Sequence, residues 1–540
     1  MPSSINRRTF LQWAGAAALG TFPARGPAQS TDEAKGLVTG QPHAAKAGMD
    51  ILAAGGNAVD AAVAAALAAG VAAVSSCGIG GYGGHLVIAF PSGKTTAIDF
   101  NTTAPAAARP DMFPLDERGQ VKGQVNTYGW LAASVPGTLA GLQLALNRYG
   151  TLPLVKVLQP AIRLARDGFE VSRSLAGVIK AAAGRLKNDP GSARLLFKNG
   201  EPLREGDTLR NPDLAALLEK LAGDNSVRAF YRGEIARRIA AAFKQNGGLV
   251  TADDLAAYQA REVEPLQFTW RGRTIVTAPL TAGGLTVLQA LATLRALGWE
   301  GGGDKATHAR LEALRLAWHD RLTLLGDPEK VEVPVARLLS KAYAEQSAER
   351  VGKAVKEQKP VPGASDGRST GGTTHLCAAD GKGLMVALTL THGGSFGACV
   401  AVDGLGLLLG HGMSRFDPRP RRPNSPGPGK RPLHNMCPTM VLQDGRPVAA
   451  LGAIGGRRIP NALFDVLVNL VGLRRSLSDA VQAPRMHTEG GLDLTCTAGW
   501  LEAELDHLKK VGYAVKSGPA AALNAIARDA ATGRLTTAAR

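Results

Sequence analysis

The sequence predicts a protein that combines many helices with antiparallel strands, and two observations indicate this. First, residues 376–379 and 384–391 are apolar, alternating runs that flank a polar, glycine-rich turn at 380–383, which is the pattern of a β-hairpin. Second, residues 131–345 are dominated by segments that are typical of helices. The chain has no internal sequence repeat.

The N-terminal part is expected to form two helices and then two strands. A helix over residues 44–54 is followed by an alanine-rich helix that Asn57 caps. A glycine-rich loop, 78–84, then leads into a strand over 85–90, and its partner strand is expected over 95–100. Such a loop can cradle a phosphate, but no Lys-Ser/Thr pair follows it and it precedes a strand. A P-loop and a dinucleotide site are therefore excluded.

The middle of the chain is predicted to be mainly helical. The expected helices span residues 136–149, 154–167, 211–222, 234–245, 286–297 and 305–325. A single strand is expected over residues 270–277.

Strands and one further helix are expected after the hairpin. The strand patterns are at residues 405–409, 439–443 and 447–451, and the helix spans 459–471. Gly455-Gly456 precedes this helix, and two adjacent backbone N–H groups can form an oxyanion hole. The competing interpretation is a plain turn, which is the more frequent role of a Gly-Gly pair.

Composition and charge limit the classes of function. The chain has 540 residues, enough for a large core or two to three domains, with 45% hydrophobic and 20% charged residues. Its net charge is +17, but the basic residues are scattered and no nucleic-acid-binding motif is present. We therefore expect no nucleic-acid partner, and we expect an electropositive surface that attracts small anions.

Neither cysteine nor histidine spacing predicts a metal site, and we expect no cofactor. An odd number of cysteines leaves at least one thiol free, and buried small side chains are the expected role of all five. The histidines are dispersed, and His319 and His434 lack a second ligand at metal spacing. The five cysteines are Cys77, Cys377, Cys399, Cys437 and Cys496.

Residues 1–28 are predicted to be a twin-arginine export signal. Arg7-Arg8 precedes the apolar residues 13–22, and Gly26-Pro27-Ala28 is a plausible cleavage site. The alternative is a short amphipathic or buried helix. The export interpretation makes the twin-arginine machinery a partner and predicts a periplasmic or secreted protein. No later segment is apolar enough for a stable membrane span.

The stretch Gly371-Gly372-Thr373 is the strongest functional signal. A threonine at the start of a strand is usually an ordinary β-former with a solvated hydroxyl. Here it follows a polar, charged segment, residues 344–372, which we expect to be a flexible linker. A cut between Gly372 and Thr373 would give Thr373 a free α-amine, which can act as the base for its own hydroxyl.

Several motifs, in this order, resemble the γ-glutamyltranspeptidase family of N-terminal nucleophile hydrolases over about residues 36–540. The motifs are Gly55-Gly56-Asn57-Ala58-Val59-Asp60-Ala61-Ala62, Val135-Pro136-Gly137-Thr138, Gln159-Pro160-Ala161, Leu164-Ala165-Arg166-Asp167-Gly168-Phe169, Leu325-Gly326-Asp327-Pro328, Thr373-Thr374-His375, Pro428-Gly429-Lys430-Arg431-Pro432-Leu433, Gly455-Gly456 and Ala483-Pro484-Arg485-Met486-His487.

The resemblance implies an α+β fold, a four-layer αββα sandwich, made by a precursor that cuts itself into two associating chains. The large chain would come from residues 36–343, followed by the linker 344–372, and the small chain from 373–540, with both forming one intertwined domain. The resemblance assigns Thr373 as the nucleophile, Thr391 as its hydrogen-bond partner, and Gly455 and Gly456 as the oxyanion hole. The implied substrate is a small-molecule amide.

The residues that hold a γ-glutamyl group in this family are replaced here. Asn101 stands where an arginine binds the α-carboxylate, and Arg415 stands where an aspartate binds the α-amine. His434 and Asn435 replace two carboxylate-binding serines. An asparagine and a glutamine that help to hold the amine become Gly393 and Gly412.

An arginine repels an ammonium group and attracts a carboxylate. We therefore hypothesise an anionic acyl group without an α-amine, as in oxamate amidohydrolases and glutaryl-type acylases. The alternatives are γ-glutamyl transfer or glutathione hydrolysis, and a binding protein that kept the fold without activity. Arg415 itself has a second interpretation, as a surface-loop arginine beside Asp417.

Overall fold

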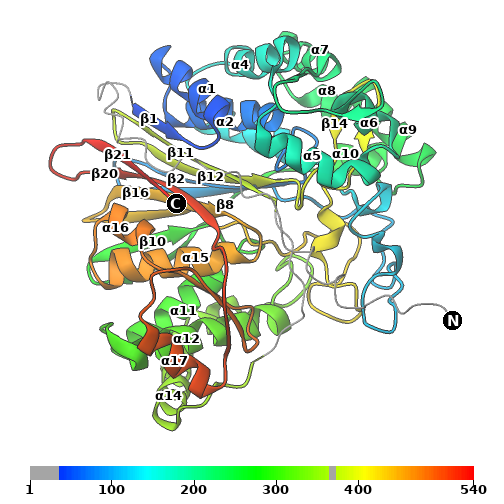
Figure 1. Cartoon of the computed structure of the whole chain (residues 1–540). Coiled ribbons are helices and arrows are strands. Elements are labelled where there is room, and N and C mark those ends of the chain that lie inside the picture. The colour runs from blue at the N-terminus through cyan, green and yellow to red at the C-terminus, as the bar shows by residue number, and fades with distance from the viewer. Residues whose placement is uncertain (1–35, 364–371) are drawn as a thin grey trace.

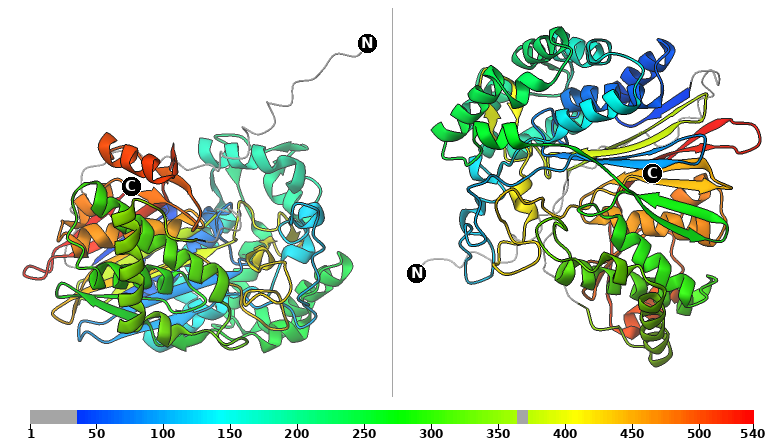
Figure 2. Two further views of the ribbon diagram at one scale, coloured as in Figure 1. Left: turned by 90° about the horizontal axis from the view of Figure 1, so that it is seen from below. Right: turned by 180° about the vertical axis from the view of Figure 1, so that it is seen from behind.

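The structure is a computed structural model and describes residues 36–363 and 372–540. Two six-stranded sheets lie face to face, and helices cover the outer side of each sheet (Figure 1). The same four layers are seen from behind (Figure 2). The α+β, four-layer sandwich is therefore confirmed. The predicted export signal, residues 1–28, lies outside the described residues.

The first sheet places the predicted hairpin at its centre. Its order is β1-β11-β12-β2-β3-β8, and every neighbouring pair is antiparallel. The hairpin strands β11 and β12 therefore lie between strands from the N-terminal part of the chain. The strands are β1 (Gly36–Thr39), β2 (Gly83–Ala89), β3 (Thr95–Asp99), β8 (Arg261–Val263), β11 (Thr374–Asp380) and β12 (Met385–Thr391).

The second sheet has the order β21-β20-β16-β15-β10-β9 and is also antiparallel throughout. The strand predicted over 270–277 is confirmed over residues 273–277, which form β10, but its start is wrong, because residues 271–272 form the turn between β9 and β10. Arg271 and Gly272 both have positive φ, 49° and 81°, as in a tight hairpin turn. The strands are β9 (Leu266–Trp270), β10 (Arg273–Thr277), β15 (Thr439–Gln443), β16 (Arg446–Ile454), β20 (Ala522–Arg528) and β21 (Leu535–Ala539).

One helical layer covers the first sheet. The alanine-rich helix α2 is buried along its whole length and packs against β11 and β12. Its small side chains let neighbouring helices approach closely, and Asn57 caps it as predicted. The helices of this half of the molecule are α1 (Pro42–Ala53), α2 (Ala58–Ala72), α3 (Thr138–Tyr149), α4 (Leu154–Asp167), α5 (Arg173–Leu186), α6 (Pro190–Leu196), α7 (Pro212–Gly223), α8 (Arg228–Tyr231), α9 (Glu234–Gln245) and α10 (Ala252–Ala257).

The other helical layer covers the second sheet, where α15 packs on β16 and α16 on β21. The helix predicted over 459–471 is α15 followed by a π-helical turn, Val468–Gly472. Within the described parts of the chain, no helix is both long and apolar enough to cross a membrane. The helices are α11 (Gly284–Ala296), α12 (Gly303–Leu324), α13 (Val335–Leu338), α14 (Lys341–Glu357), α15 (Arg458–Leu467), α16 (Leu477–Gln482) and α17 (Glu502–Val511).

Helix α14 corrects the prediction that the linker is flexible from residue 344. Its buried residues are Ala344, Ser347, Ala348, Val351 and Ala354, which recur at helical spacing. Four of these five are alanine or serine, so the buried face of the helix is only weakly apolar. The amphipathic pattern was therefore not recognised in the sequence. Residues 364–371 of the predicted linker lie outside the described residues.

The remaining strands are short and lie outside the two large sheets. The predicted strand 405–409 is reduced to β14, which pairs with β13. These strands are β4 (Phe169–Glu170), β5 (Phe197–Lys198), β6 (Glu201–Pro202), β7 (Thr208–Leu209), β13 (Ala401–Val402), β14 (Leu407–Leu408), β17 (Met486–His487), β18 (Asp493–Cys496) and β19 (Ala514–Ser517).

Candidate active site

Thr373 lies immediately before β11, at one end of the space between the two sheets. The register pairs Thr374 with Leu390, which brings Thr373 beside Thr391 at the end of β12. Thr373 is buried, with 5% of its surface exposed. The hydroxyl of Thr391 donates a hydrogen bond to the carbonyl oxygen of Gly372 and accepts one from the N–H of Gly393 at 2.7 Å.

Gly372 occupies a conformation that favours glycine. Its φ is 146°, and a Cβ atom at this position would lie 2.5 Å from the carbonyl carbon of Gly394. A larger residue would therefore displace the peptide group that joins Gly372 to Thr373. That peptide group is the one predicted to be cut.

Gly455 and Gly456 follow β16, which packs against β11. A Cβ atom at Gly452 would lie 2.2 Å from the ring of His375, so β16 and β11 are in close contact two residues after Thr373. The two glycines therefore lie at the same end of the sandwich as Thr373. Both have positive φ, 144° and 61°, which explains the choice of glycine at these positions.

A row of polar residues crosses the first sheet two residues away from Thr373 and Thr391 along their strands. The register aligns His375, Thr389, His85, Asp99 and Arg261 across five neighbouring strands. The His375 Nδ1 atom lies 2.8 Å from the Thr389 hydroxyl, and Arg261 pairs with Asp99 at 2.5 Å. The next row on the same face is apolar and consists of Cys377, Ala387, Val87, Ala97 and Val263.

A pocket of about 80 Å³ lies beside these residues and is lined by three arginines, Arg321, Arg415 and Arg457. The predicted residues Arg415 and Asn435 both line it. The pocket connects to Thr391, the predicted partner of the nucleophile, through one residue, because Arg415 donates a hydrogen bond to the Gly393 carbonyl and the Gly393 N–H donates to Thr391. The other lining residues are Trp318, Leu322, Ser414, Asp417, Asn424 and Leu433.

The pocket is electropositive, although carboxylates contribute to it. Arg457 pairs with Glu489 at 2.8 Å, and Asp417 pairs with Arg419 at 2.6 Å. Burial lowers the pKa of Arg415, and the charge of Arg457 lowers it further, while Tyr82 raises it. An arginine keeps its charge despite such shifts, because its ordinary pKa is far above neutral pH.

Four of the six predicted substrate-binding residues do not line this pocket, and Asn101 and His434 are two of them. The amide nitrogen of Asn101 donates to the Thr281 hydroxyl at 2.7 Å and to the Pro432 carbonyl at 2.8 Å. The ring of His434 is also buried and contacts His85. The structure therefore places both side chains behind the pocket wall.

The predicted residues Gly393 and Gly412 are both tightly enclosed. A Cβ atom at Gly393 would lie 2.2 Å from the ring of His411, and one at Gly412 would lie 2.0 Å from the Ser134 hydroxyl. No longer side chain fits at either position without a rearrangement. Their small size therefore helps to bring the Arg415 segment close to Thr391.

Sequence reasoning missed Tyr82, Arg321 and Arg457. Tyr82 lies beside Arg415 and Thr391; burial raises its pKa, and Arg415 and Thr391 oppose that shift. Arg457 directly follows the predicted oxyanion glycines, so its position in the chain was an available signal. Arg321 lies inside α12, and no local pattern distinguishes it from the other basic residues of that helix.

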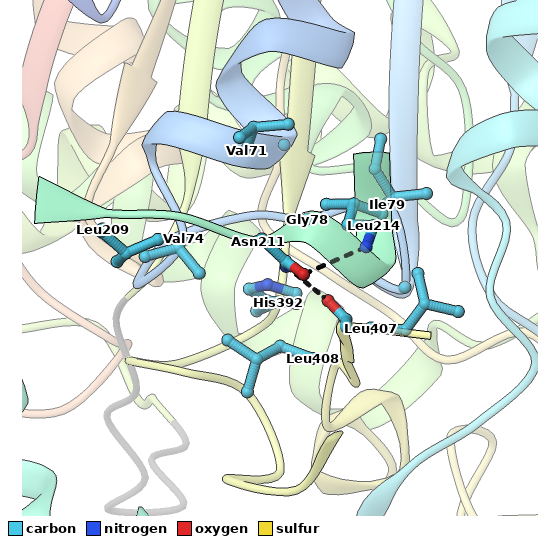
Figure 3. Close-up of a pocket in the computed structure, with 13 residues that line it drawn as sticks. Val71, Val74, Gly78, Ile79, Leu209, Asn211, Leu214, His392, Leu407 and Leu408 are labelled. Atoms are coloured by element: carbon cyan, nitrogen blue, oxygen red, sulfur yellow. Dashed lines mark hydrogen bonds between the residues drawn. The ribbon is translucent and has the colours of Figure 1, made fainter. Parts of the chain in front are cut away.

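A second, smaller cavity lies on the helical side of the first sheet, next to His392 (Figure 3). It has a volume of about 10 Å³, room for about one water molecule. Asn211 beside it is engaged with the Leu214 N–H and the Gly406 carbonyl. Burial lowers the pKa of His392 to about 3, so its ring is neutral at ordinary pH. This cavity is too small for an amide substrate.

The five cysteines are buried, as predicted, and all five are free. Among residues 36–363 and 372–540, no group of three or more histidine, cysteine, aspartate or glutamate side chains is arranged to hold a metal ion.

Comparison with known sequences identifies the family. The sequence model of the family described as "Gamma-glutamyltranspeptidase" matches residues 44–539. The chain is 40% identical to the glutathione hydrolase proenzyme of Escherichia coli over 461 residues, which is 82% of this chain and 79% of that protein. It is also 40% identical to the Acylase ACY 1 proenzyme of a Pseudomonas strain over 504 residues, 91% of this chain and 89% of that protein.

Solved structures agree. Cephalosporin acylase from Bacillus halodurans matches with a TM-score of 0.85 and 29% identity, covering 96% of each chain. The γ-glutamyltranspeptidase of Helicobacter pylori matches with a TM-score of 0.56 and 36% identity, over 60% of this chain and 93% of that one. The sandwich is thus the N-terminal nucleophile hydrolase fold. The chain belongs to the γ-glutamyltranspeptidase family and is an enzyme of that family.

Proposed function

We propose that this enzyme is a self-cleaving threonine amidohydrolase or acyltransferase, with Thr373 as its nucleophile. The hydrogen bond from Thr391 to the Gly372 carbonyl carries the first part of the proposal. The Thr373 hydroxyl would attack that carbonyl carbon, and the C–N bond to Thr373 would break as an ester forms. Water would then hydrolyse the ester. The products are a carboxylate at Gly372 and a free α-amine at Thr373.

The two chains would stay together after the cut, because both sheets contain strands from each. In the first sheet, β11 and β12 of the small chain lie between β1 and β2 of the large chain. In the second sheet, β15 of the small chain pairs with β10 of the large chain. Separation would break both sheets, so the mature enzyme is proposed to be an intertwined two-chain molecule.

Turnover would use the same atoms. The new α-amine of Thr373 takes the hydroxyl proton as the oxygen attacks the amide carbonyl of the substrate, and the proton passes to the departing amine. The N–H groups of Gly455 and Gly456 are proposed to stabilise the negative oxygen of the tetrahedral intermediate. Thr391 would hold the nucleophile in place. Water or an acceptor amine then releases the acyl group from Thr373.

The acyl group is proposed to be anionic and to lack an α-amine, as in oxamate- or glutaryl-type amides. The supporting observation is the pocket that Arg321, Arg415 and Arg457 line, which the hydrogen bonds of Gly393 connect to Thr391. A carboxylate is attracted to this pocket and can pair with a guanidinium in a bidentate manner, whereas an ammonium is repelled. The predicted role of Asn435 as a substrate contact is part of this proposal.

A γ-glutamyl donor is the second candidate, because the Escherichia coli glutathione hydrolase is as similar to this chain as the acylase is. Sequence identity therefore does not separate the two functions. The basic side chain of Arg415 favours the acylase-type substrate, since a γ-glutamyl group carries an ammonium as well as a carboxylate.

The test is a pair of substrates that differ only in the α-amine. Glutaryl-p-nitroanilide and γ-glutamyl-p-nitroanilide present the same chain length to the enzyme. We expect kcat/KM to be at least about tenfold higher for the glutaryl compound, a difference of about 1.4 kcal/mol in transition-state binding. Equal values, or a preference for the γ-glutamyl compound, would reject the proposed acyl specificity.

We also propose that residues 1–28 direct export through the twin-arginine machinery. Arg7-Arg8 and the apolar segment after it support this. Replacing both arginines with lysine keeps the charge, so retention of that variant inside the cell would support export by this route. Export at the wild-type level would reject it.

A further inference from the structure

We propose that His434, His85 and Asp99 form a buried chain of polar contacts that positions the wall of the arginine pocket. We call this group the histidine chain. In this proposal His434 does not touch the substrate, and it sets specificity by holding Asn435 and Arg321 in place. The inference rests on the proposed function of that pocket.

The proton positions in the histidine chain follow from one backbone group. The N–H of Met436 donates to Nδ1 of His434 at 3.1 Å, so the proton of the neutral His434 ring is on Nε2. His434 Nε2 lies 3.0 Å from Nδ1 of His85 and therefore donates to it. The His85 proton is then on Nε2, which lies 3.2 Å from the Asp99 carboxylate, within charge-pair distance but outside hydrogen-bond geometry. Each ring thus has one tautomer that is consistent with the groups beside it.

Both rings are neutral at ordinary pH. Burial lowers the pKa of His85 to about 4; Asp99 opposes this shift, while Arg261 and Arg431 reinforce it. Burial also lowers the pKa of His434 well below its usual value, and His85, Arg321 and Arg415 lower it further.

Asp99 at the end of the histidine chain is ionised. Burial alone would raise the pKa of its carboxyl, but His85, Arg431 and Arg261 together lower it. The chain therefore ends on a fixed negative charge, which favours the Nε2–H tautomer of His85.

The histidine chain connects to the pocket through the backbone of His434. The Arg321 guanidinium donates to the His434 carbonyl at 2.6 Å and contacts the Asn435 side-chain oxygen at 3.3 Å. Arg321 and Asn435 both line the pocket. The wall is also held through Thr281, whose carbonyl accepts from the His434 N–H at 3.1 Å and whose hydroxyl accepts from Asn101. The residues behind the wall thus decide where its polar groups point.

Stability alone would not distinguish this role, because losing any buried hydrogen bond destabilises a fold. The test therefore measures discrimination between two substrates, glutaryl-p-nitroanilide and its methyl ester. Their acyl groups differ only in a terminal carboxylate. The ratio of their kcat/KM values does not depend on how much of a sample is folded and active.

The main variant is His85→Leu, which removes both ring contacts at a similar volume. We expect it to lower the wild-type preference for the carboxylate about tenfold, through a higher KM for glutaryl-p-nitroanilide and with little change for the ester. His85→Asn keeps an acceptor near the position of Nδ1 and is expected to restore much of the preference. The matched control is His308→Leu, which removes another fully buried histidine, one that contacts Glu312 at 3.1 Å and lies outside the pocket.

A second variant, His434→Asn, keeps an acceptor for the Met436 N–H and loses the contact with His85. It is expected to lose the preference as His85→Leu does. The role proposed for the histidine chain would be overturned if either folded variant kept the wild-type ratio of kcat/KM values. It would also be overturned if His308→Leu lost the preference for the carboxylate to the same extent. A wild-type enzyme without any preference for the carboxylate would instead reject the proposed function of the pocket, so the two failures are distinct.

Discussion

The hydroxyl of Thr391 donates a hydrogen bond to the carbonyl oxygen of Gly372, the residue before the predicted nucleophile. The same hydroxyl accepts a hydrogen bond from the N–H of Gly393 at 2.7 Å, which fixes its orientation. A donor placed on this carbonyl polarises it toward attack by Thr373 and stabilises the charge that develops on its oxygen. In the proposed mechanism, one side chain would assist both the cut and the later turnover at the same position.

Replacing Thr373 by alanine should abolish self-cleavage, because the attacking oxygen is lost. The intact mass of purified wild-type protein should show two chains, one of them beginning at Thr373 and ending at Arg540. Thr373→Ala should show one chain. Thr373→Ser is the matched control: it retains a hydroxyl and should cut at the same bond. Two chains in Thr373→Ala would rule out this nucleophile.

The variant Thr391→Ala should cleave itself roughly 100-fold more slowly than wild type, which is the usual effect of removing one oxyanion donor. The rate is read from the disappearance of the uncut chain with time after synthesis. Thr391→Ser keeps the hydroxyl that donates to Gly372 and should mature at close to the wild-type rate. Maturation of Thr391→Ala as fast as wild type would show that the hydrogen bond to Gly372 has no part in the cut.

Replacing Arg415 by glutamine should weaken turnover of glutaryl-p-nitroanilide by a factor of roughly 10 to 100. The loss corresponds to one hydrogen bond to a charged group, about 1.5–3 kcal/mol. Steady-state kinetics on both the glutaryl substrate and its methyl ester should locate the loss in the carboxylate. Arg422→Gln removes the same charge from an exposed position outside the pocket and should leave both substrates unaffected. Equal effects of the two variants would point to general charge attraction.

Acid should destabilise the fold between about pH 6.5 and pH 5. Burial lowers the pKa of His375, His392 and His411 to about 3 and that of His85 to about 4, from 6.5. Below pH 6.5 the unfolded chain binds protons that the folded chain does not bind. The free energy of unfolding therefore falls as pH falls, and above pH 6.5 these groups add no pH dependence.

Thermal unfolding measured at half-unit pH steps tests this directly. Between pH 6.5 and 5 most carboxylates are still ionised in both states, so the histidines dominate the slope. His411→Gln removes one group that binds a proton only in the unfolded chain. The slope of the unfolding free energy against pH should therefore become shallower by up to about 1.4 kcal/mol per pH unit. A midpoint that is constant or rises toward pH 5 would contradict the prediction.

Local patterns predicted much of the secondary structure. Helices α4 and α9 have the expected bounds, and the hairpin of β11 and β12 follows from its alternating pattern and glycine-rich turn. Two predictions had a wrong boundary where the local signal was weak. The buried face of α14 is made of small residues, and the turn between β9 and β10 contains an arginine at positive φ, which turn-residue preferences do not favour.

The sequence by itself determined the family motifs, the candidate nucleophile Thr373 and the changed residues around it, because these are properties of short, contiguous segments. Only the tertiary structure decided that Arg321 and Arg457 join Arg415 in one pocket, and that His85 and Asp99 stand behind His434. His85 and His434 are 349 positions apart. Sheet order and helix packing bring such residues together, and no periodicity within one segment encodes which distant segment will be its neighbour.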